Sequence, residues 1–426
     1  MRKKDLSRII TFVAIIAVLA LAAAFAISCG SSSSSSSSSG SSGGTSGGTI
    51  KIGTLYPVTG DLAKLGQECV NAIHLAVDEI NAAGGIKSMG GAKIELVEAD
   101  SQGKPDVGIS EVQRLVSQNH VSAIIGTYQS SVAIPATQTA DRLKTPIVIS
   151  MAVADEITQH GYKYVFRICP KADWYAKSQL DFVQAMPQLD PSYTFLPVKR
   201  IALLHEDTDF GQSTAIGQRK YIKQLGLTLA GEVAYPGSAA DLTTQVSKIK
   251  SMTPDIVLTT TYLNDAILIA QARQKLGMKQ LFFDAAGGTV DPEFIKRLGP
   301  AAENILTEIE FTKYAGPVAK DLNAKYNTKY GNDITGNGAY SYQAMYVIAK
   351  ALENAKSSDP TKLRDALAAV KLDKAAGDRV VVPANPIQFG PDGQVTNAPL
   401  FVVQVQKGQL IPVFPAEFAA AKVTNP

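Results

Sequence analysis

IKIGTLYPVTGDLAKLGQECVNAIHLAVDEINAAGGI, which runs from Ile50 to Ile86, combines one strand pattern with one helix pattern. Together with Thr49, its first residues read TIKIGTLYP, and their β-branched side chains predict a strand. The next segment, LAKLGQECVNAIHLAVDEINAAGG, has apolar residues at helical spacing and ends at Gly84 and Gly85, so it predicts a helix. A strand followed by an amphipathic helix is the repeating unit of an α/β domain.

The same alternation continues along the chain. Strands are predicted at KIELVEAD, SAIIGT and TPIVISM, with helices at 107–119 and 132–143. After VFRICP a second series begins, with strands at RIALLHED, LTLAGEVAY, DIVLTTT and QLFFDAA and helices at 212–225, 242–252 and 265–276. The strand ILTEIEF, helices at 318–330, 340–355 and 360–370, and a hairpin in PLFVVQVQKGQLIPVFP that turns at Lys407 and Gly408 complete the chain. Short apolar strands between helices predict parallel sheets covered on both faces, so we expect an α/β fold with two doubly wound lobes.

Length and charge limit the choice of partners. The 378 residues from Thr49 to Pro426 are too many for one compact core and suit two lobes. The net charge of +3 belongs to residues 1–28, which carry four basic residues and one acid, so the rest of the chain is neutral. A neutral chain gives no reason to expect a nucleic acid as partner.

The N-terminus has the pattern of an export signal. Four basic residues among the first eight precede an uncharged apolar run at 9–27, and Cys29 follows. This order resembles a bacterial lipoprotein signal, which predicts a cleaved signal at 1–28, a lipidated Cys29 and a flexible Ser/Gly tether within 29–48. The alternative is an uncleaved anchor helix, because the run is just long enough to span a bilayer. Either way, we expect the folded part outside the cytoplasm.

Two further cysteines, Cys69 and Cys169, leave two interpretations open. They can form a disulfide in an oxidising compartment. Alternatively they are inert core thiols, since Cys69 lies at helical spacing with Ile73 and Val77.

Signals of catalysis and metal binding are missing. The four histidines are far apart and do not have metal-ligand spacing. The segment GQSTA at Gly211 has Ala215 where a nucleophile elbow needs a second glycine, and there is no Walker loop or Rossmann fingerprint. We therefore expect neither an enzyme nor a metal or cofactor.

GTYQSSVAIP is the segment with the clearest ligand-binding chemistry. Ser130 and Ser131 precede a predicted helix, and Pro135 suits a first helical turn, where backbone N–H groups have no internal acceptor. Two hydroxyls beside free N–H groups at a helix N-terminus make a carboxylate site. The alternative is that one serine simply caps the helix.

Several segments, taken in order, resemble one known family. They are the opening segment at 50–86, VSAIIGTYQSSVAIPATQTADRLKTPIVIS, YVFRICP, IALLHEDTDFGQS, YPGSAADLTTQVSKIKSMTPDIVLTT and FGPDGQ. The chain resembles the branched-chain amino-acid (leucine/isoleucine/valine-binding) type of periplasmic solute-binding protein, which serves ABC transporters. The resemblance implies the type I periplasmic binding protein fold, in which two lobes joined by a three-strand hinge close around a small solute. It places lobe 1 at 49–167 and 312–388 and lobe 2 at 168–311 and 389–426, with crossings near Arg167, 305–311 and Phe389.

The resemblance also assigns first-lobe ligand contacts. Ser130 matches the family's carboxylate-binding serine, with Ser131 beside it. Ala152 matches a residue whose backbone carbonyl binds the ligand ammonium, whereas the family's threonine hydroxyl is missing because Val153 or Ala154 stands at that position. Part of the usual amino-acid clamp is therefore absent.

Aromatic residues are expected to close the same cleft. Phe210 and Tyr262 match family positions whose rings close over the ligand from the second lobe. Tyr56 and Tyr128, at the ends of first-lobe strands, are further candidates for the lining.

The largest departure from the family lies in LFFDAAGG. The family's ammonium-binding glutamate matches Ala286, which cannot pair with a cation. Asp284 stands two residues earlier, on the same face of a strand, and either replaces the missing acid or is a loop cap. A buried ammonium without a counter-charge is costly, so the solute is an amino acid only if Asp284 reaches it.

The function expected from this resemblance is a lipid-anchored, monomeric receptor that delivers an amino acid or related small carboxylate or amide to an ABC permease. The alternative is a lipoprotein of the same fold that has lost its solute and serves as an envelope interaction or sensory protein. The missing hydroxyl and the missing glutamate keep this alternative open.

Overall fold

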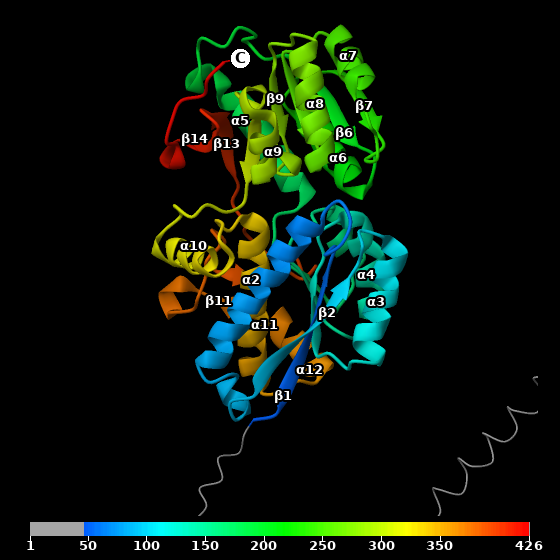
Figure 1. The fold of residues 1–426 in the computed structure, drawn as a ribbon, viewed down its shortest axis with the longest axis vertical. Coiled ribbons are helices and arrows are strands. Elements are labelled where there is room, and N and C mark those ends of the chain that lie inside the picture. The colour runs from blue at the N-terminus through cyan, green and yellow to red at the C-terminus, as the bar shows by residue number, and fades with distance from the viewer. Residues whose placement is uncertain (1–46, 426) are drawn as a thin grey trace, which may run out of the picture. The chain divides into compact units, whose positions relative to one another are not determined.

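Two β-sheets organise residues 47–425, the part of the chain that the computed structural model describes (Figure 1). The predicted signal, Cys29 and almost all of the Ser/Gly tract lie outside the described residues. Contacts join the described residues into one unit.

The first sheet is entirely parallel, in the order β2-β1-β3-β4-β5. Its strands are β1 (Thr49–Tyr56), β2 (Lys93–Asp100), β3 (Ala123–Gly126), β4 (Ile147–Ile149) and β5 (Val165–Arg167). Three of them, β3, β4 and β5, are buried along their whole length, as expected for strands covered by helices on both faces.

The second sheet has the order β14-β13-β10-β9-β8-β6-β7. Its parallel part comprises β6 (Arg200–Glu206), β7 (Thr228–Tyr235), β8 (Ile256–Thr260), β9 (Leu281–Asp284) and β10 (Leu306–Ile309). The antiparallel strands β13 (Phe401–Gln406) and β14 (Gln409–Phe414) extend it at one edge. The prediction of an α/β fold with two parallel-sheet lobes is confirmed.

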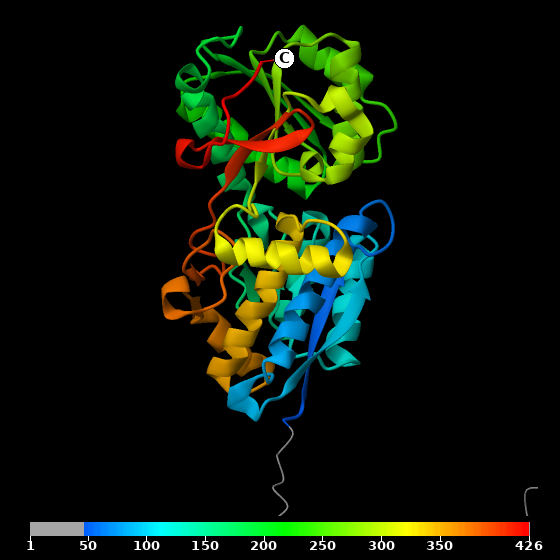
Figure 2. The same cartoon turned by 60° about the vertical axis from the view of Figure 1, so that its left-hand side comes forward.

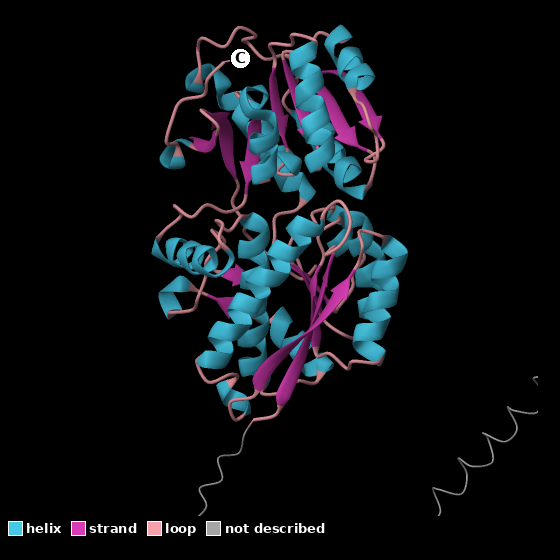
Figure 3. Cartoon of the chain, viewed as in Figure 1, coloured by secondary structure: helices cyan, strands magenta, loops and turns pink. Residues whose placement is uncertain are grey.

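Helices flank both sheets (Figure 3). Around the first sheet are α2 (Ala63–Ala82), α3 (Pro105–Ser117), α4 (Ser130–Arg142), α10 (Pro317–Tyr330), α11 (Gly336–Ala355) and α12 (Pro360–Ala368), with a two-stranded ribbon of β11 (Lys371–Leu372) and β12 (Ile387–Gln388). Around the second sheet are α5 (Ala172–Leu189), α6 (Asp209–Gln224), α7 (Thr243–Ser251), α8 (Leu263–Lys275) and α9 (Pro292–Leu298). We call the first set, with its sheet, the first lobe and the second set the second lobe.

Local sequence explains these elements well. The α2 helix buries one stripe that includes Cys69, Ile73, Val77 and Ile80, and it packs on α11 from the far end of the chain. The hairpin turn between β13 and β14 falls at Lys407 and Gly408, as predicted, and both residues have positive φ.

Two helices and one proline differ from the sequence prediction. Neither α5 nor α9 was predicted, and α5 contains Pro187 within its last turn, which obscures its helical pattern. Pro135 lies inside α4 and not in its first turn, because the helix already begins at Ser130. The N-terminal N–H groups of α4 are therefore those of the two serines and Val132, since the first intrahelical bond is donated by Ala133 to Gln129.

The chain passes between the two lobes after β5, after β10 and before β13 (Figure 2). Arg167, at the end of β5, is fully buried and ties the first of these segments to the third. Its Nε donates to Gln394 Oε1 at 2.5 Å, and the backbones of Arg167 and Val395 are also hydrogen-bonded. This side chain fixes the geometry where the chain crosses between the lobes.

No helix within residues 47–425 is both long enough and apolar enough to cross a membrane.

Candidate ligand-binding cleft

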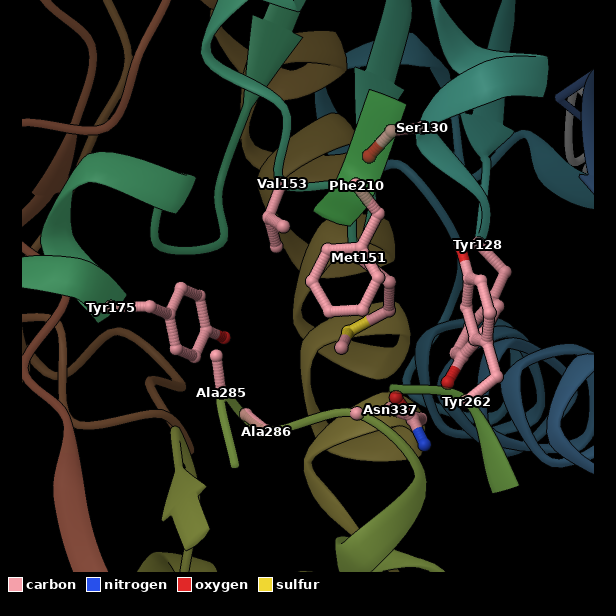
Figure 4. Close-up of a pocket in the computed structure, with 11 residues that line it drawn as sticks. Tyr128, Ser130, Met151, Val153, Tyr175, Phe210, Tyr262, Ala285, Ala286 and Asn337 are labelled. Carbon is pink, nitrogen blue, oxygen red and sulfur yellow. The ribbon is translucent and has the colours of Figure 1, made fainter. Parts of the chain in front are cut away.

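A small cavity lies where both lobes meet, beyond the carboxyl ends of their strands (Figure 4). The first lobe contributes Tyr128, Ser130, Met151, Val153 and Asn337, and the second contributes Tyr175, Phe210, Tyr262, Ala285, Ala286 and Gly287. We call this space the inner cavity. Its lining includes no acidic or basic side chain.

Aromatic rings fill most of the inner cavity. The Tyr262 ring lies between two others, 6.2 Å from the ring of Tyr128 across the lobe boundary and 5.4 Å from that of Phe210. The free volume is about 30 Å³, close to the volume of one water molecule in the liquid. In this conformation the lobes are closed and the rings pack on one another.

Two polar contacts also join the lobes. The backbone N–H of Asp155 donates to Ser213 Oγ at 2.9 Å. Lys64 Nζ on α2 lies 3.1 Å from Glu293 Oε1 on α9. Both contacts lie between elements of different lobes and link them in this conformation.

Ser130 lies in the inner cavity at the start of α4 and is almost completely buried. Its Oγ accepts the backbone N–H of Ala154 at 3.1 Å. The hydroxyl hydrogen remains available for donation, and the free N–H groups of the first helical turn are beside it. This arrangement is suited to a carboxylate oxygen.

Ala152 and Ala154 do not line the inner cavity. The guanidinium of Arg167 binds both backbone carbonyls, at 3.4 Å for Ala152 and 2.6 Å for Ala154. The Ala152 carbonyl, predicted to face the solute, thus lies beside Arg167 and the Cys169 thiol and outside the lining. The neighbouring residues Met151 and Val153 face the cavity instead.

Asp284 is also directed away from the inner cavity. Its Oδ1 accepts the hydroxyls of Thr259 at 2.9 Å and Thr261 at 3.0 Å, and its Oδ2 accepts that of Thr289 at 2.9 Å. Burial raises the pKa of this carboxyl to about 6, although the threonine hydrogen bonds oppose the rise. Of the two interpretations left open by the sequence, a replacement acid or a loop cap, these hydrogen bonds to neighbouring loops favour the loop cap.

Tyr56 is likewise absent from the lining. It is fully buried in the first lobe, where its hydroxyl lies 2.6 Å from Ser150 Oγ and 3.1 Å from Ser341 Oγ. Of the four aromatic candidates, Tyr128, Phe210 and Tyr262 are brought together and Tyr56 is not.

A second space, which we call the outer chamber, lies on the other side of Tyr262 and has a volume of about 450 Å³. Ser131 lines it, so the two adjacent serines face different spaces. The rest of its lining comes from the loops after strands of both sheets: Pro57, Thr59, Asp61, Leu62, Gln102, Gly103, Gln129, Glu206, Asp207, Thr208, Pro236, Gly237, Ser238, Tyr262, Leu263, Asn264 and Asp265.

Comparison with known proteins agrees with this architecture. The family model described as periplasmic binding protein matches residues 49–409. The chain belongs to the periplasmic binding protein family. A curated relative, Leu/Ile/Val-binding protein homolog 7 of Brucella suis biovar 1 (strain 1330), is 32% identical over 387 residues, which cover 88% of this chain and 94% of that protein.

Solved structures show the same fold. The leucine-binding protein LivK of Thermotoga maritima has a TM-score of 0.74 at 23% identity, covering 85% of this periplasmic binding protein and 97% of LivK. The substrate-binding protein LivJ of Streptococcus pneumoniae, solved in complex with isoleucine, has a TM-score of 0.74 at 24% identity, covering 89% and 100%. The family is one of extracytoplasmic binding proteins and not of enzymes.

Sequence reasoning missed five lining residues of this periplasmic binding protein, namely Met151, Tyr175, Ala285, Gly287 and Asn337. Asn337 enters from α11, more than 200 residues after Ser130, and Tyr175 belongs to α5, a helix that was not predicted. Met151 is the second residue after β4, and its position just beyond a strand end was the one local signal that could have indicated it.

Cys69 and Cys169 are free, buried thiols in this periplasmic binding protein. The Sγ atom of Cys69 lies 3.6 Å from the carbonyl of Asn337, and that of Cys169 lies 3.6 Å from the carbonyl of Ala152. The structure thus has the core-thiol arrangement and not the disulfide. Burial raises the pKa of the Cys169 thiol to about 12.

Proposed function

We propose that this protein captures a small organic carboxylate, an amino acid or a related acid or amide, outside the cytoplasm and delivers it as a monomer to an ABC permease. The observation that carries this proposal is the Ser130 hydroxyl beside the free N–H groups of α4, inside an uncharged cavity bordered by both lobes. Such groups bind a carboxylate strongly where water is excluded.

The proposed mechanism has two steps. The first lobe binds the solute carboxylate at Ser130, with Asn337 close by. The second lobe then closes, and Phe210 and Tyr262 cover the solute. Closure removes water, which strengthens each hydrogen bond to the carboxylate.

We further propose that the moving bodies are residues 49–167 with 312–388 and residues 168–311 with 389–426. The segments near Arg167, 305–311 and Phe389 would then form the hinge. Arg167 supports this assignment, because its side chain connects the first and third of these segments. A permease that binds the closed form would distinguish loaded from empty receptor.

A thermal-shift screen over carboxylates, amino acids and amides tests the capture step. One class should raise the melting temperature, by an amount that grows with the logarithm of the ratio of ligand concentration to Kd. Ser130→Ala and Phe210→Ala should each abolish that shift. Ser130→Ala leaves the buried N–H of Ala154 without an acceptor, so Asn337→Ala serves as a second cavity variant that leaves this bond intact. A shift that survives all three substitutions would contradict the proposed pocket.

For the anchor, we propose that Cys29 carries the lipid. The sequence pattern around it supports this, and the Ser/Gly tract that follows would let the folded part reach a permease at distances on the order of 25 Å. Cells grown with labelled palmitate should label the protein, and Cys29→Ser should abolish the label. A labelled Cys29→Ser protein would refute lipidation at this residue.

The small free volume of the inner cavity favours a second candidate function. A receptor whose cleft is filled by its own aromatic rings would serve as an envelope interaction or sensory protein without a solute. Native mass spectrometry of freshly purified protein separates the two functions. A co-purified small molecule supports capture, whereas a bare chain together with a flat thermal-shift screen supports the interaction function.

A further inference from the structure

The outer chamber provides space that the inner cavity lacks. Its volume of about 450 Å³ lies in the range of ligand pockets, which is about 300–1,000 Å³. Tyr262 lines both spaces, and the adjacent residues Ser130 and Ser131 face one each. A solute bound at Ser130 therefore has a second compartment directly beyond the Tyr262 ring.

The two compartments differ sharply in charge. The inner cavity has no charged side chain in its lining, and its polar groups suit an anion. The outer chamber is lined by Asp61, Glu206, Asp207 and Asp265, and by no basic side chain. An anion is thus favoured on one side of Tyr262 and a cation on the other.

Two of the four acids already serve the protein itself. Glu206 accepts hydrogen bonds from the backbone N–H groups of Thr208 at 2.7 Å and Gly211 at 2.6 Å. Asp265 accepts the backbone N–H of Tyr262 at 2.9 Å and the hydroxyl of Tyr235 at 2.7 Å. These carboxyls organise the loops and are not free to bind a solute directly.

The other two acids are available. Asp61 and Asp207 are exposed, and within residues 47–425 neither side chain has a hydrogen-bond or ion-pair partner. Asp61 belongs to the loop after β1 in the first lobe, and Asp207 belongs to the loop after β6 in the second. A cation held between them would connect the two lobes.

We propose that the solute is a carboxylate whose cationic group stands at the far end of its carbon chain, an ω-amino acid, and not an α-amino acid. This inference rests on the proposed function, because the carboxylate is bound at Ser130. An α-ammonium would lie beside Ala286 and Val153, which carry no charge, and the buried acid on this side, Glu310, lies behind the lining and is hydrogen-bonded to Tyr175. A terminal ammonium would pass the Tyr262 ring and reach Asp61 and Asp207.

The aromatic residues suit such a molecule. Methylene groups pack favourably on the rings of Phe210 and Tyr262, and a cation close to a tyrosine face gains further attraction. Because Tyr262 lies between the two spaces, its ring must turn aside to admit the chain. Its turning would join the inner cavity and the outer chamber into one site.

Isothermal titration of the full-length protein with three probes of equal carbon chain tests the inference. The probes are valerate, norvaline and δ-aminovalerate, which carry no amine, an α-amine and a terminal amine. We expect δ-aminovalerate to bind at least tenfold more tightly than either of the others. The double variant Asp61→Asn, Asp207→Asn should reduce this advantage over valerate at least tenfold. Glu95→Gln, an exposed acid on β2 outside both spaces, is the matched control and should leave the advantage unchanged.

Two results would overturn the inference while leaving the proposed function standing. One is equal binding of valerate and δ-aminovalerate, with both abolished by Ser130→Ala. The other is tightest binding of norvaline. If none of the probes binds and no carboxylate shifts the melting temperature, the proposed function fails together with the inference.

Discussion

Arg167→Met is the substitution whose effect follows most directly from the structure. The change keeps an unbranched side chain of similar length but removes all five N–H donors of a fully buried guanidinium. The donors lost include those to Gln394 Oε1 at 2.5 Å and to the Ala154 carbonyl at 2.6 Å. The hydroxyl of Thr158, which accepts at 3.2 Å, can turn to another acceptor.

The expected loss of stability is the difference between two opposing terms. Gln394 Oε1 is left without a donor, which costs about 1–3 kcal/mol, whereas the Ala154 carbonyl keeps the backbone N–H of Ile157 at 3.2 Å and loses only one of its two hydrogen bonds, at about 1 kcal/mol. Removing the charge offsets part of this cost, because the folded protein no longer has to bury a guanidinium without its water. The cost of that burial is reflected in the pKa of Arg167, which desolvation lowers. Within residues 47–425 no carboxylate lies within ion-pair distance of Arg167, and the charge is attracted only by more distant acids such as Asp155 and Asp392. We therefore expect a net loss of about 1–3 kcal/mol, or about 1–4 °C in melting temperature for a chain of this size.

Urea denaturation followed by circular dichroism measures this loss. Arg297→Met, an exposed arginine on α9, is the matched control and should change the unfolding free energy by less than about 0.5 kcal/mol. A double-mutant cycle of Arg167→Met, Gln394→Met and the variant with both substitutions measures the interaction between the two side chains. We expect a coupling free energy of about 1–2 kcal/mol. An unfolding free energy unchanged by Arg167→Met would refute the view that this residue fixes the hinge.

Two further predictions concern buried titratable groups. The pKa of Asp284 in the folded protein is about 6, above its ordinary value of 3.8, so the folded state binds the proton more tightly. As the pH falls from about 8 to about 4, the unfolding free energy of the wild type should therefore rise by up to about 3 kcal/mol relative to that of Asp284→Asn. Urea denaturation of both proteins at several pH values measures this difference. A difference that does not change with pH would contradict the prediction. Cys69 and Cys169 are free and fully buried, so a thiol-reactive disulfide reagent should not label them in the native protein. In a Cys29→Ser variant that is denatured without reductant, the same reagent should label two thiols. No reactive thiol after denaturation would instead show that the two are bonded.

Ser130 and Asp284 illustrate how differently two sequence predictions fared. Ser130 was recognised from adjacent hydroxyls at the start of a helix, and such local patterns persist in the folded chain. Asp284 was selected because it stands two residues before Ala286 near the end of a strand. Its partners Thr259 and Thr261 belong to the end of β8 and the residue after it, 23 to 25 residues away, so no local pattern indicated that they would hydrogen-bond the carboxylate.

The alternation of β-branched runs and amphipathic helices was enough to determine the α/β class, the parallel sheets and the hairpin at Lys407 and Gly408, because periodicity and turn chemistry are local properties. The cleft was decided by the tertiary structure. Asn337 joins Ser130 across more than 200 residues, Arg167 takes the carbonyls of Ala152 and Ala154, and Tyr262 separates an uncharged cavity from an acidic chamber. Which of several nearby polar groups faces a solute depends on which of them the rest of the fold has already hydrogen-bonded.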